Sequence, residues 1–183
     1  MRGPTMNGAL QVVVMGVSGT GTSAVGSRVA ERLGVPYVEG DEHHPAANIA
    51  KMAAGTPLTD DDRRPWLEEL AEVLASRERA GTSTLLGCSA LRRTYRDLLR
   101  GGLPAGTVGF LHLVAEPEVL HRRMEEREHF MPPSLLRSQL ATLEPLEPDE
   151  LGTAIDVDAP LDVVVERGVE AVRALAGRGA ALR

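Results

Sequence analysis

Residues 16–23 read Gly16-Val17-Ser18-Gly19-Thr20-Gly21-Thr22-Ser23, which has the G-x-x-x-x-G-x-[ST] spacing of a phosphate-binding loop (P-loop). Its three glycines let backbone N–H groups crowd around a polyphosphate, and the positive end of a following helix would point to the same place. We therefore expect all of these residues to bind the phosphates of a nucleotide. The hydroxyl of Ser23 is expected to bind Mg²⁺ directly.

One position departs from the usual motif, because Thr22 stands where a lysine precedes the final Ser or Thr. That lysine reaches the β- and γ-phosphates, and a threonine brings no charge there. We therefore expect nucleotide binding, with phosphoryl transfer put in question. A Gly-rich turn that binds nothing is the alternative for the loop.

Strand, loop and helix follow one another in the order that a P-loop needs. Residues 10–15 are an almost wholly apolar run, typical of a strand buried on both faces of a parallel sheet. Helical spacing then extends to Leu33, and Gly34 is the expected stop. Further short apolar runs lie at 35–38, 84–88, 108–114 and 154–157. They alternate with helical patterns, which predicts a parallel sheet covered on both faces.

The composition is that of one acidic domain. With 183 residues and a net charge of −6, the chain has the length of a single domain (1–183), with flexible ends expected at 1–9 and 177–183. The charge argues against a general nucleic-acid or membrane binder and favours a small ligand. The single cysteine, Cys88, is expected in the core, and no signal-like segment appears, so we expect a cytoplasmic protein.

Acidic residues follow the second apolar run, at the strand end where ligands of parallel sheets gather. Asp41 is the candidate base that accepts the proton of an alcohol, and Glu39 is expected to hold Mg²⁺ through water. Helix capping and solvation are the alternative roles of such carboxylates. The adjacent His43 and His44 lack the spacing of helical metal ligands, so no zinc site is expected.

Several cations follow these acidic residues, and we expect about half of them to be functional, with the rest solvated or weakly paired. They are Lys51, Arg63, Arg64, Arg92, Arg93 and Arg96. Arg123, Arg127 and His129 precede a segment broken by prolines, which favours a lid over about residues 122–143 that closes on the transferred phosphate. A charged helix face is the alternative there.

Longer motifs run through nearly the whole chain. Residues 40–67 read G-D-x-x-H-P-x-x-N-x-x-K-M-x-x-G-x-P-L-x-D-D-D-R-x-P-W-L, and shorter motifs lie at 15–19, 88–92, 95–100, 123–130 and 138–144. With these motifs the chain resembles the gluconokinases, small P-loop kinases that phosphorylate D-gluconate at its 6-hydroxyl. A residue, usually glycine, is missing before His129, and Thr22 replaces the P-loop lysine.

The resemblance implies an α/β, three-layer P-loop kinase fold with a five-stranded parallel sheet, similar to nucleoside and shikimate kinases, with a helical lid. It implies ATP, Mg²⁺, gluconate as substrate and a homodimer. Asp41 looks like the base on the acceptor side, Arg127 like a catalytic lid arginine and Arg123 like a lid arginine that binds the nucleotide. The residues that look like ligands of the acceptor or of the transferred phosphate are His44, Lys51, Arg63, Arg92, Arg96 and His129.

The expected reaction converts gluconate and ATP to 6-phosphogluconate and ADP by direct in-line transfer, impaired by Thr22. Two alternatives stay open. One is a catalytically weak protein that binds a nucleotide or a sugar acid, and the other is a kinase for another small sugar acid or polyol.

Overall fold

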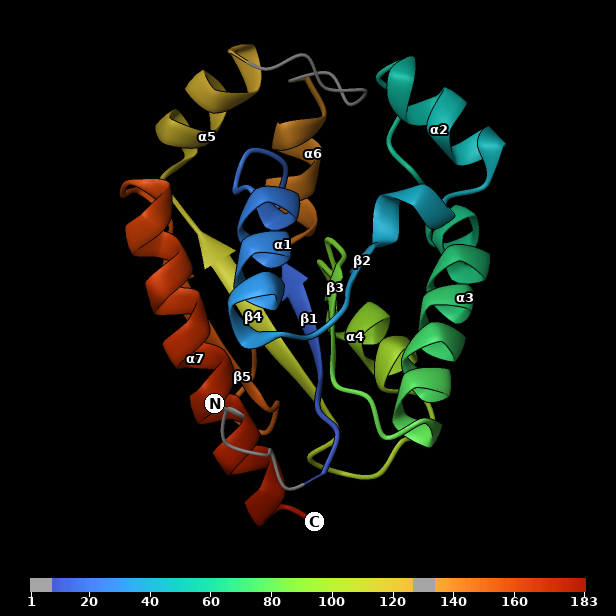
Figure 1. Cartoon of the computed structure of the whole chain (residues 1–183). Helices are drawn as coiled ribbons and strands as arrows, with labels where there is room; N and C mark the ends of the chain where they lie inside the picture. The colour runs from blue at the N-terminus through green and yellow to red at the C-terminus, as the bar shows by residue number, and fades with distance from the viewer. Residues whose placement is uncertain (1–7, 127–133) are drawn as a thin grey trace.

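The computed structural model describes residues 8–126 and 134–183. At its centre is a parallel sheet of five strands in the order β2-β3-β1-β4-β5 (Figure 1). The strands are β1 (Gln11–Met15), β2 (Tyr37–Glu39), β3 (Thr84–Gly87), β4 (Val108–Val114) and β5 (Gly152–Asp156). The predicted sheet is therefore confirmed.

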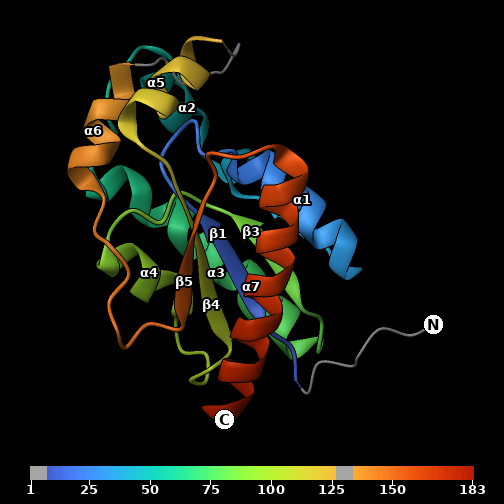
Figure 2. The same ribbon diagram turned by 90° about the vertical axis from the view of Figure 1, so that its left-hand side faces the viewer.

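Helices cover both faces of this sheet, as Figures 1 and 2 show. On one face α1 (Thr22–Leu33) and α7 (Leu161–Ala181) pack over Val12 and Val14, and on the other face α3 (Asp60–Arg79) and α4 (Arg93–Arg100) pack over Val13 and Met15. Successive residues of a strand point to opposite faces. Both faces of β1 are thus buried, which explains why all of its residues except Gln11 are apolar.

The remaining elements lie beyond the carboxyl ends of the strands, at the top of Figure 2. They are the 3₁₀ turn η1 (Gly40–His43), α2 (Ala46–Ala53), α5 (Pro117–Glu125) and α6 (Ser134–Thr142). The P-loop joins β1 to α1 at this same edge. The P-loop and the polar residues that follow β2 and β3 therefore lie at one edge, as expected for a parallel α/β sheet.

Local sequence explains where two of the helices begin and end. At the start of α3 the Thr59 hydroxyl accepts from the Asp62 N–H at 3.1 Å, while the Asp62 carboxylate accepts from the Thr59 N–H at 2.8 Å. This reciprocal pair is a capping box. The helix α1 ends at Gly34, whose φ of 68° lies in the left-handed region that glycine adopts without strain.

The two outer strands are displaced from their predicted ranges. The N–H of Val35 donates to the carbonyl of Ala30 at 3.0 Å, so it still belongs to the end of α1 and β2 begins only at Tyr37. At the other edge β5 begins at Gly152, which pairs with Phe110 of β4. Hydrogen-bond partners in the neighbouring strands decide where β2 and β5 begin and end.

The chain ends are more ordered than expected over the described residues. The helix α7 continues to Ala181, so most of the segment 177–183 is helical rather than frayed. Ala9 is buried, and Arg183 donates to its carbonyl at 2.6 Å. This hydrogen bond, which ties the C-terminal residue to the start of the described chain, explains part of the difference. Cys88 is buried in the core on the α3 and α4 side, as predicted.

Across residues 8–126 and 134–183, no helix is both long enough and apolar enough to span a membrane.

Candidate active site

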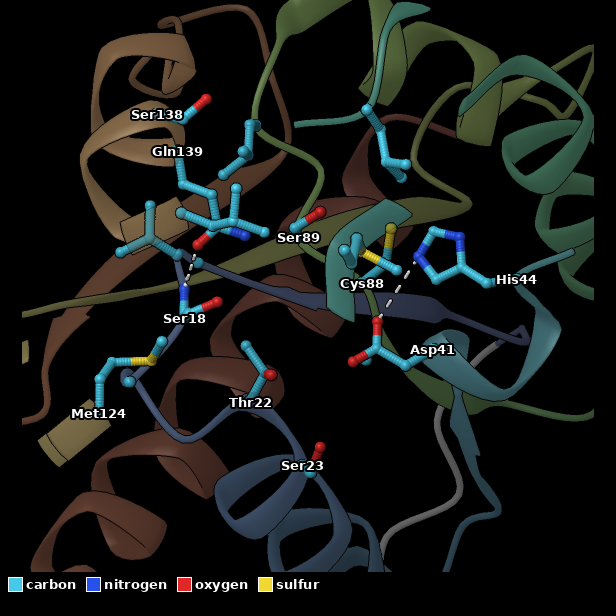
Figure 3. Close-up of a pocket in the computed structure, with 18 of the residues that line it drawn as sticks. Ser18, Thr22, Ser23, Asp41, His44, Cys88, Ser89, Met124, Ser138 and Gln139 are labelled. Atoms are coloured by element: carbon cyan, nitrogen blue, oxygen red, sulfur yellow. Dashed lines mark hydrogen bonds and ion pairs between the residues drawn. The ribbon is translucent and has the colours of Figure 1, made fainter. Parts of the chain in front are cut away.

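A cavity of about 220 Å³ lies at the carboxyl edge of the sheet, between the P-loop, η1, α3 and α6 (Figure 3). It brings together many of the predicted site residues. Those that line it are Gly16, Val17, Ser18, Gly19, Gly21, Thr22, Ser23, Glu39, Asp41, His44 and Arg63. The local motifs thus predicted the residues on the P-loop side and on the acidic side of the pocket.

The P-loop has the backbone shape that its glycines predict. Gly19 and Gly21 adopt φ values of 89° and 85°, which a residue with a Cβ rarely adopts. A Cβ at Gly19 would also lie 3.1 Å from the carbonyl of Leu120. The side chain of Thr20 is buried and its hydroxyl donates to the Val17 carbonyl at 2.8 Å, so it braces the loop and does not line the cavity.

Helix α6 lies against the P-loop through Gln139. The backbone N–H of Ser18 donates to the Gln139 Oε1 at 2.7 Å, as the dashed line in Figure 3 marks. The amide oxygen thereby accepts from a P-loop N–H, the type of donor that binds phosphate oxygens in such loops. Gln139 could not be assigned to the site from local sequence patterns, because this contact joins residues far apart in the chain.

Two carboxylates stand on the other side of the cavity. Glu39 ends β2 and accepts from the Tyr37 hydroxyl at 3.2 Å, and Asp41 follows in η1. Burial, together with the negative charge of Glu39, raises the pKa of Asp41 to about 6. A carboxylate with a pKa near neutrality, placed in a pocket, suits the role of a general base.

His44 is held by stacking and stays neutral. Its ring stacks on Trp66 with 3.9 Å between ring centroids, and the Trp66 indole N–H donates to the Gly40 carbonyl at 2.8 Å. Burial, and secondarily the charge of Arg63, lowers the pKa of His44 to about 4. The ring is therefore neutral at physiological pH. Trp66 lines the pocket, and the sequence alone had not given it this role.

The neighbours of His44 select its tautomer. The Asn48 Nδ2 donates to the carbonyl of Asp62 at 2.8 Å and lies 3.4 Å from the His44 Nδ1. The His44 Nδ1 thus faces a donor, which leaves the proton of the neutral ring on Nε2. That nitrogen lies 3.9 Å from the Asp41 Oδ1 (Figure 3), so it presents an N–H toward the carboxylate from beyond direct hydrogen-bond distance.

Three of the expected cationic ligands are bound to protein groups and do not line the cavity. The Lys51 ammonium binds both carboxylate oxygens of Asp62, at 2.9 and 2.8 Å, and so ties α2 to the start of α3. The Arg92 guanidinium lies 3.3 Å from the Asp60 carboxylate. Arg123 donates to the carbonyl of Val157 at 2.8 Å, which ties α5 to the segment after β5.

Arg96 is a structural arginine in this fold, contrary to the expectation that it binds substrate. Its side chain is fully buried and forms two hydrogen bonds with the equally buried Glu150, at 2.8 and 2.9 Å. It also donates to backbone carbonyls of Ala90, Glu144 and Pro145. The N–H donors of the Arg96 guanidinium are therefore bound to protein acceptors rather than directed at a substrate.

Arg127 and His129 lie outside the described residues, together with the centre of the expected lid at 122–143. The described parts of that range belong to α5 and α6. Met124 of α5 and Ser138 and Gln139 of α6 line the same cavity as the P-loop (Figure 3). The lid itself stays a prediction.

No family model matches the chain, whereas individual proteins do. It is 48% identical over 157 residues to the gluconokinase of Gluconobacter oxydans, an alignment that covers 85% of this chain and 86% of that protein. A crystal structure of a gluconokinase from Sinorhizobium meliloti is similar with a TM-score of 0.83 and 47% identity, over 92% of this chain and 94% of that one. The APS kinase of Mycobacterium tuberculosis shares the fold, with a TM-score of 0.63 at 18% identity over 91% and 98% of the two chains. The chain is a P-loop kinase and belongs to the gluconokinase family.

Proposed function

We propose that this protein phosphorylates D-gluconate at its 6-hydroxyl with ATP, giving 6-phosphogluconate and ADP by direct in-line transfer. The observation that carries the proposal is Asp41, a carboxylate with a pKa of about 6 that shares one pocket with a P-loop. An alcohol acceptor needs a group that takes its proton as the phosphate transfers. The membership of the gluconokinase family supports gluconate as that alcohol.

The P-loop is proposed to hold the phosphates of ATP through backbone N–H groups and the positive end of α1. Thr22 lies in the first turn of α1 and lines the pocket, where it offers a hydroxyl and an N–H but no charge. Binding therefore relies on the backbone. Transition-state charge on the phosphate must be stabilised by other groups, among which we propose Arg127 and also Arg123, which would have to exchange its contact with the Val157 carbonyl for one with the phosphate.

The residues present fit Mg²⁺, a cation that prefers oxygen ligands. Ser23 is an exposed residue at the start of α1, and it lines the same cavity as Glu39 and Asp41. Ser23 would bind the metal directly and Glu39 through water. When bound, Mg²⁺ neutralises charge on the phosphates during transfer.

On the acceptor side, Asp41 is proposed to accept the proton of the 6-hydroxyl, with the neutral His44 donating its Nε2–H to the acceptor or to Asp41. Arg63, which lines the pocket, is proposed to bind the sugar acid. His129 is proposed to do so from outside the described residues. On the resemblance to the family alone, we further propose a cytoplasmic homodimer.

The test is an ADP-release assay with a panel of acceptors that includes gluconate, other sugar acids and uncharged polyols, with Mg²⁺ and with a chelator in excess. We expect ADP with gluconate only when Mg²⁺ is present, and 6-phosphogluconate as the product. A second candidate function is favoured by Thr22, namely a protein that binds ATP and gluconate without transfer. Binding of both ligands without ADP formation would select it, and ADP release with another acceptor alone would select a different kinase.

A further inference from the structure

Tyr95, in α4, joins two arginines to one carboxylate beside the active-site pocket. Its ring is buried, and its hydroxyl donates to the Asp60 carboxylate in the first turn of α3. The same hydroxyl accepts from the Arg63 Nη1 at 3.2 Å. One oxygen thus bridges an acid and a guanidinium that come from the same helix.

The aromatic ring makes a second set of contacts. The guanidinium carbon of Arg63 lies 5.4 Å from the ring centroid, and that of Arg92 lies 5.9 Å from it. Both distances are in the range of cation–π attraction. Arg92 also contacts Asp60 at 3.3 Å, so the ring and the carboxylate together hold two guanidinium groups.

The charges of this cluster do not cancel. Two guanidinium groups face the single carboxylate of Asp60, whose pKa is lowered by the hydrogen bond from Tyr95 and further by Arg92, Arg63 and Arg64. The cluster therefore keeps an excess of positive charge. Arg63 brings that charge to the wall of the cavity that also contains Asp41 and Trp66.

We propose that Tyr95, together with Asp60, is a positioning residue that holds Arg63 at the cavity wall for the carboxylate of the acceptor, while Arg92, which does not line the cavity, adds positive charge to the cluster. This inference rests on the proposed function. A long arginine side chain loses conformational freedom when it binds a ligand, and a guanidinium that is already held loses less. The hydroxyl of Tyr95 therefore acts on acceptor binding through Arg63, without touching the acceptor.

The variant that tests this role is Tyr95→Phe, because it keeps the ring and both cation–π contacts and removes only the bridging hydroxyl. We expect the KM for gluconate to rise by at least about tenfold, the lower end of the range for one lost hydrogen bond to a charged group, while the KM for ATP stays within about twofold. A purely structural role would lower the melting temperature and alter both KM values together.

A double-mutant cycle with Arg63→Gln shows whether Tyr95 acts through Arg63. In the Arg63→Gln background, Tyr95→Phe should change the gluconate KM by less than about twofold, because the side chain that it positions is gone. Arg64→Gln is the matched control, since it removes the same charge from the neighbouring exposed position of α3. We expect it to leave the KM for gluconate within about twofold of the parent.

Failure of this inference is distinguishable from failure of the proposed function. Trp66 is the only tryptophan in the sequence and lines the pocket, so its fluorescence reports gluconate binding without turnover. If the parent binds gluconate but releases no ADP, the kinase proposal fails, and the dissociation constants of the variants for gluconate still decide the role of Tyr95.

If the parent is active and the Tyr95→Phe variant has an unchanged KM for gluconate, only the inference about Tyr95 is overturned. Effects that multiply in the double mutant, or a Tyr95→Phe protein that is unfolded by circular dichroism, overturn it as well. A parent that does not bind gluconate overturns both.

Discussion

Asp41 is the single residue on which the proposed transfer depends most directly. Asp41→Asn keeps the shape of the side chain and removes the oxygen that accepts the proton. We expect kcat for gluconate phosphorylation to fall by about 10²–10⁴-fold, with ATP affinity within about twofold of the parent. Steady-state kinetics and a nucleotide titration measure the two quantities. A variant that turns over like its parent would exclude Asp41 as the base.

The raised pKa of Asp41 also predicts how activity depends on pH. Only the ionised carboxylate accepts a proton, so kcat/KM should be level above a pH of about 6 and should fall up to about tenfold per unit below it. His44, with a pKa of about 4, stays neutral through this range and adds no step near pH 6. Rates measured between about pH 5 and 8 test this, and a profile that is flat down to about pH 5 would contradict it.

Thr22 is the residue at which this P-loop departs from its motif. Thr22→Lys places a charge where negative charge builds up on the phosphate oxygens during transfer. We expect kcat to rise by at least about tenfold, a barrier decrease of roughly 1.4 kcal/mol, with a smaller change in ATP affinity. Parallel kinetics of the two proteins provide the measurement. An ordinary kinase rate in the parent, with no gain from lysine, would mean that another cation already supplies this charge.

At the level of elements, the ends of β2 and β3 approach so closely that only glycine fits between them. A Cβ at Gly40 would lie 2.1 Å from the carbonyl oxygen of Gly87, a backbone atom that cannot move aside freely. Gly40→Ala should therefore destabilise the fold by about 1–3 kcal/mol and displace the adjacent Asp41. Thermal unfolding and kcat should both decrease.

The control for this change is Gly177→Ala, because a Cβ at Gly177 in α7 meets no atom within 4 Å. Alanine is a better helix former than glycine, so this variant should be as stable as the parent or more stable by about 0.5–1 kcal/mol. Equal melting temperatures of the Gly40→Ala variant and the parent would show that the two strand ends can separate without cost.

At the scale of the whole molecule, Glu150 joins α4 to the segment that follows α6. Its buried carboxylate pairs with Arg96 and Arg100, at 2.8 and 3.0 Å. Glu150→Gln leaves the buried Arg96 without its countercharge, so we expect a loss of about 3–5 kcal/mol in the free energy of unfolding. For a domain of this length that is a decrease of roughly 6–20 °C in melting temperature.

The matched control for Glu150→Gln is Glu72→Gln, which breaks the exposed pair between Glu72 and Arg79 on the surface of α3. Exposed ion pairs contribute little, so its unfolding free energy should change by less than about 1 kcal/mol. If the two variants lose equal stability, burial of the Arg96–Glu150 pair has no special effect on the fold.

The fold class and the position of the phosphate site follow from the sequence by itself. Both depend on local patterns: the apolar run of β1, the glycine spacing of residues 16–23 and the helix that ends at Gly34. Neighbours along the chain are enough to decide backbone geometry of this kind. The predicted limits of β2 and β5 differ from the observed ones, because hydrogen-bond partners in the neighbouring strands define where a strand begins and ends.

Only the tertiary structure decided which charged side chains reach the pocket. Lys51, Arg63, Arg92 and Arg96 have the same character in the sequence, yet Arg63 lines the cavity while Arg96 is buried against Glu150. The contact of Gln139 with Ser18 likewise depends on α6 lying over the P-loop. A buried arginine needs a carboxylate that compensates the cost of its desolvation. Packing between distant segments, rather than spacing along the chain, decides which carboxylate lies next to it.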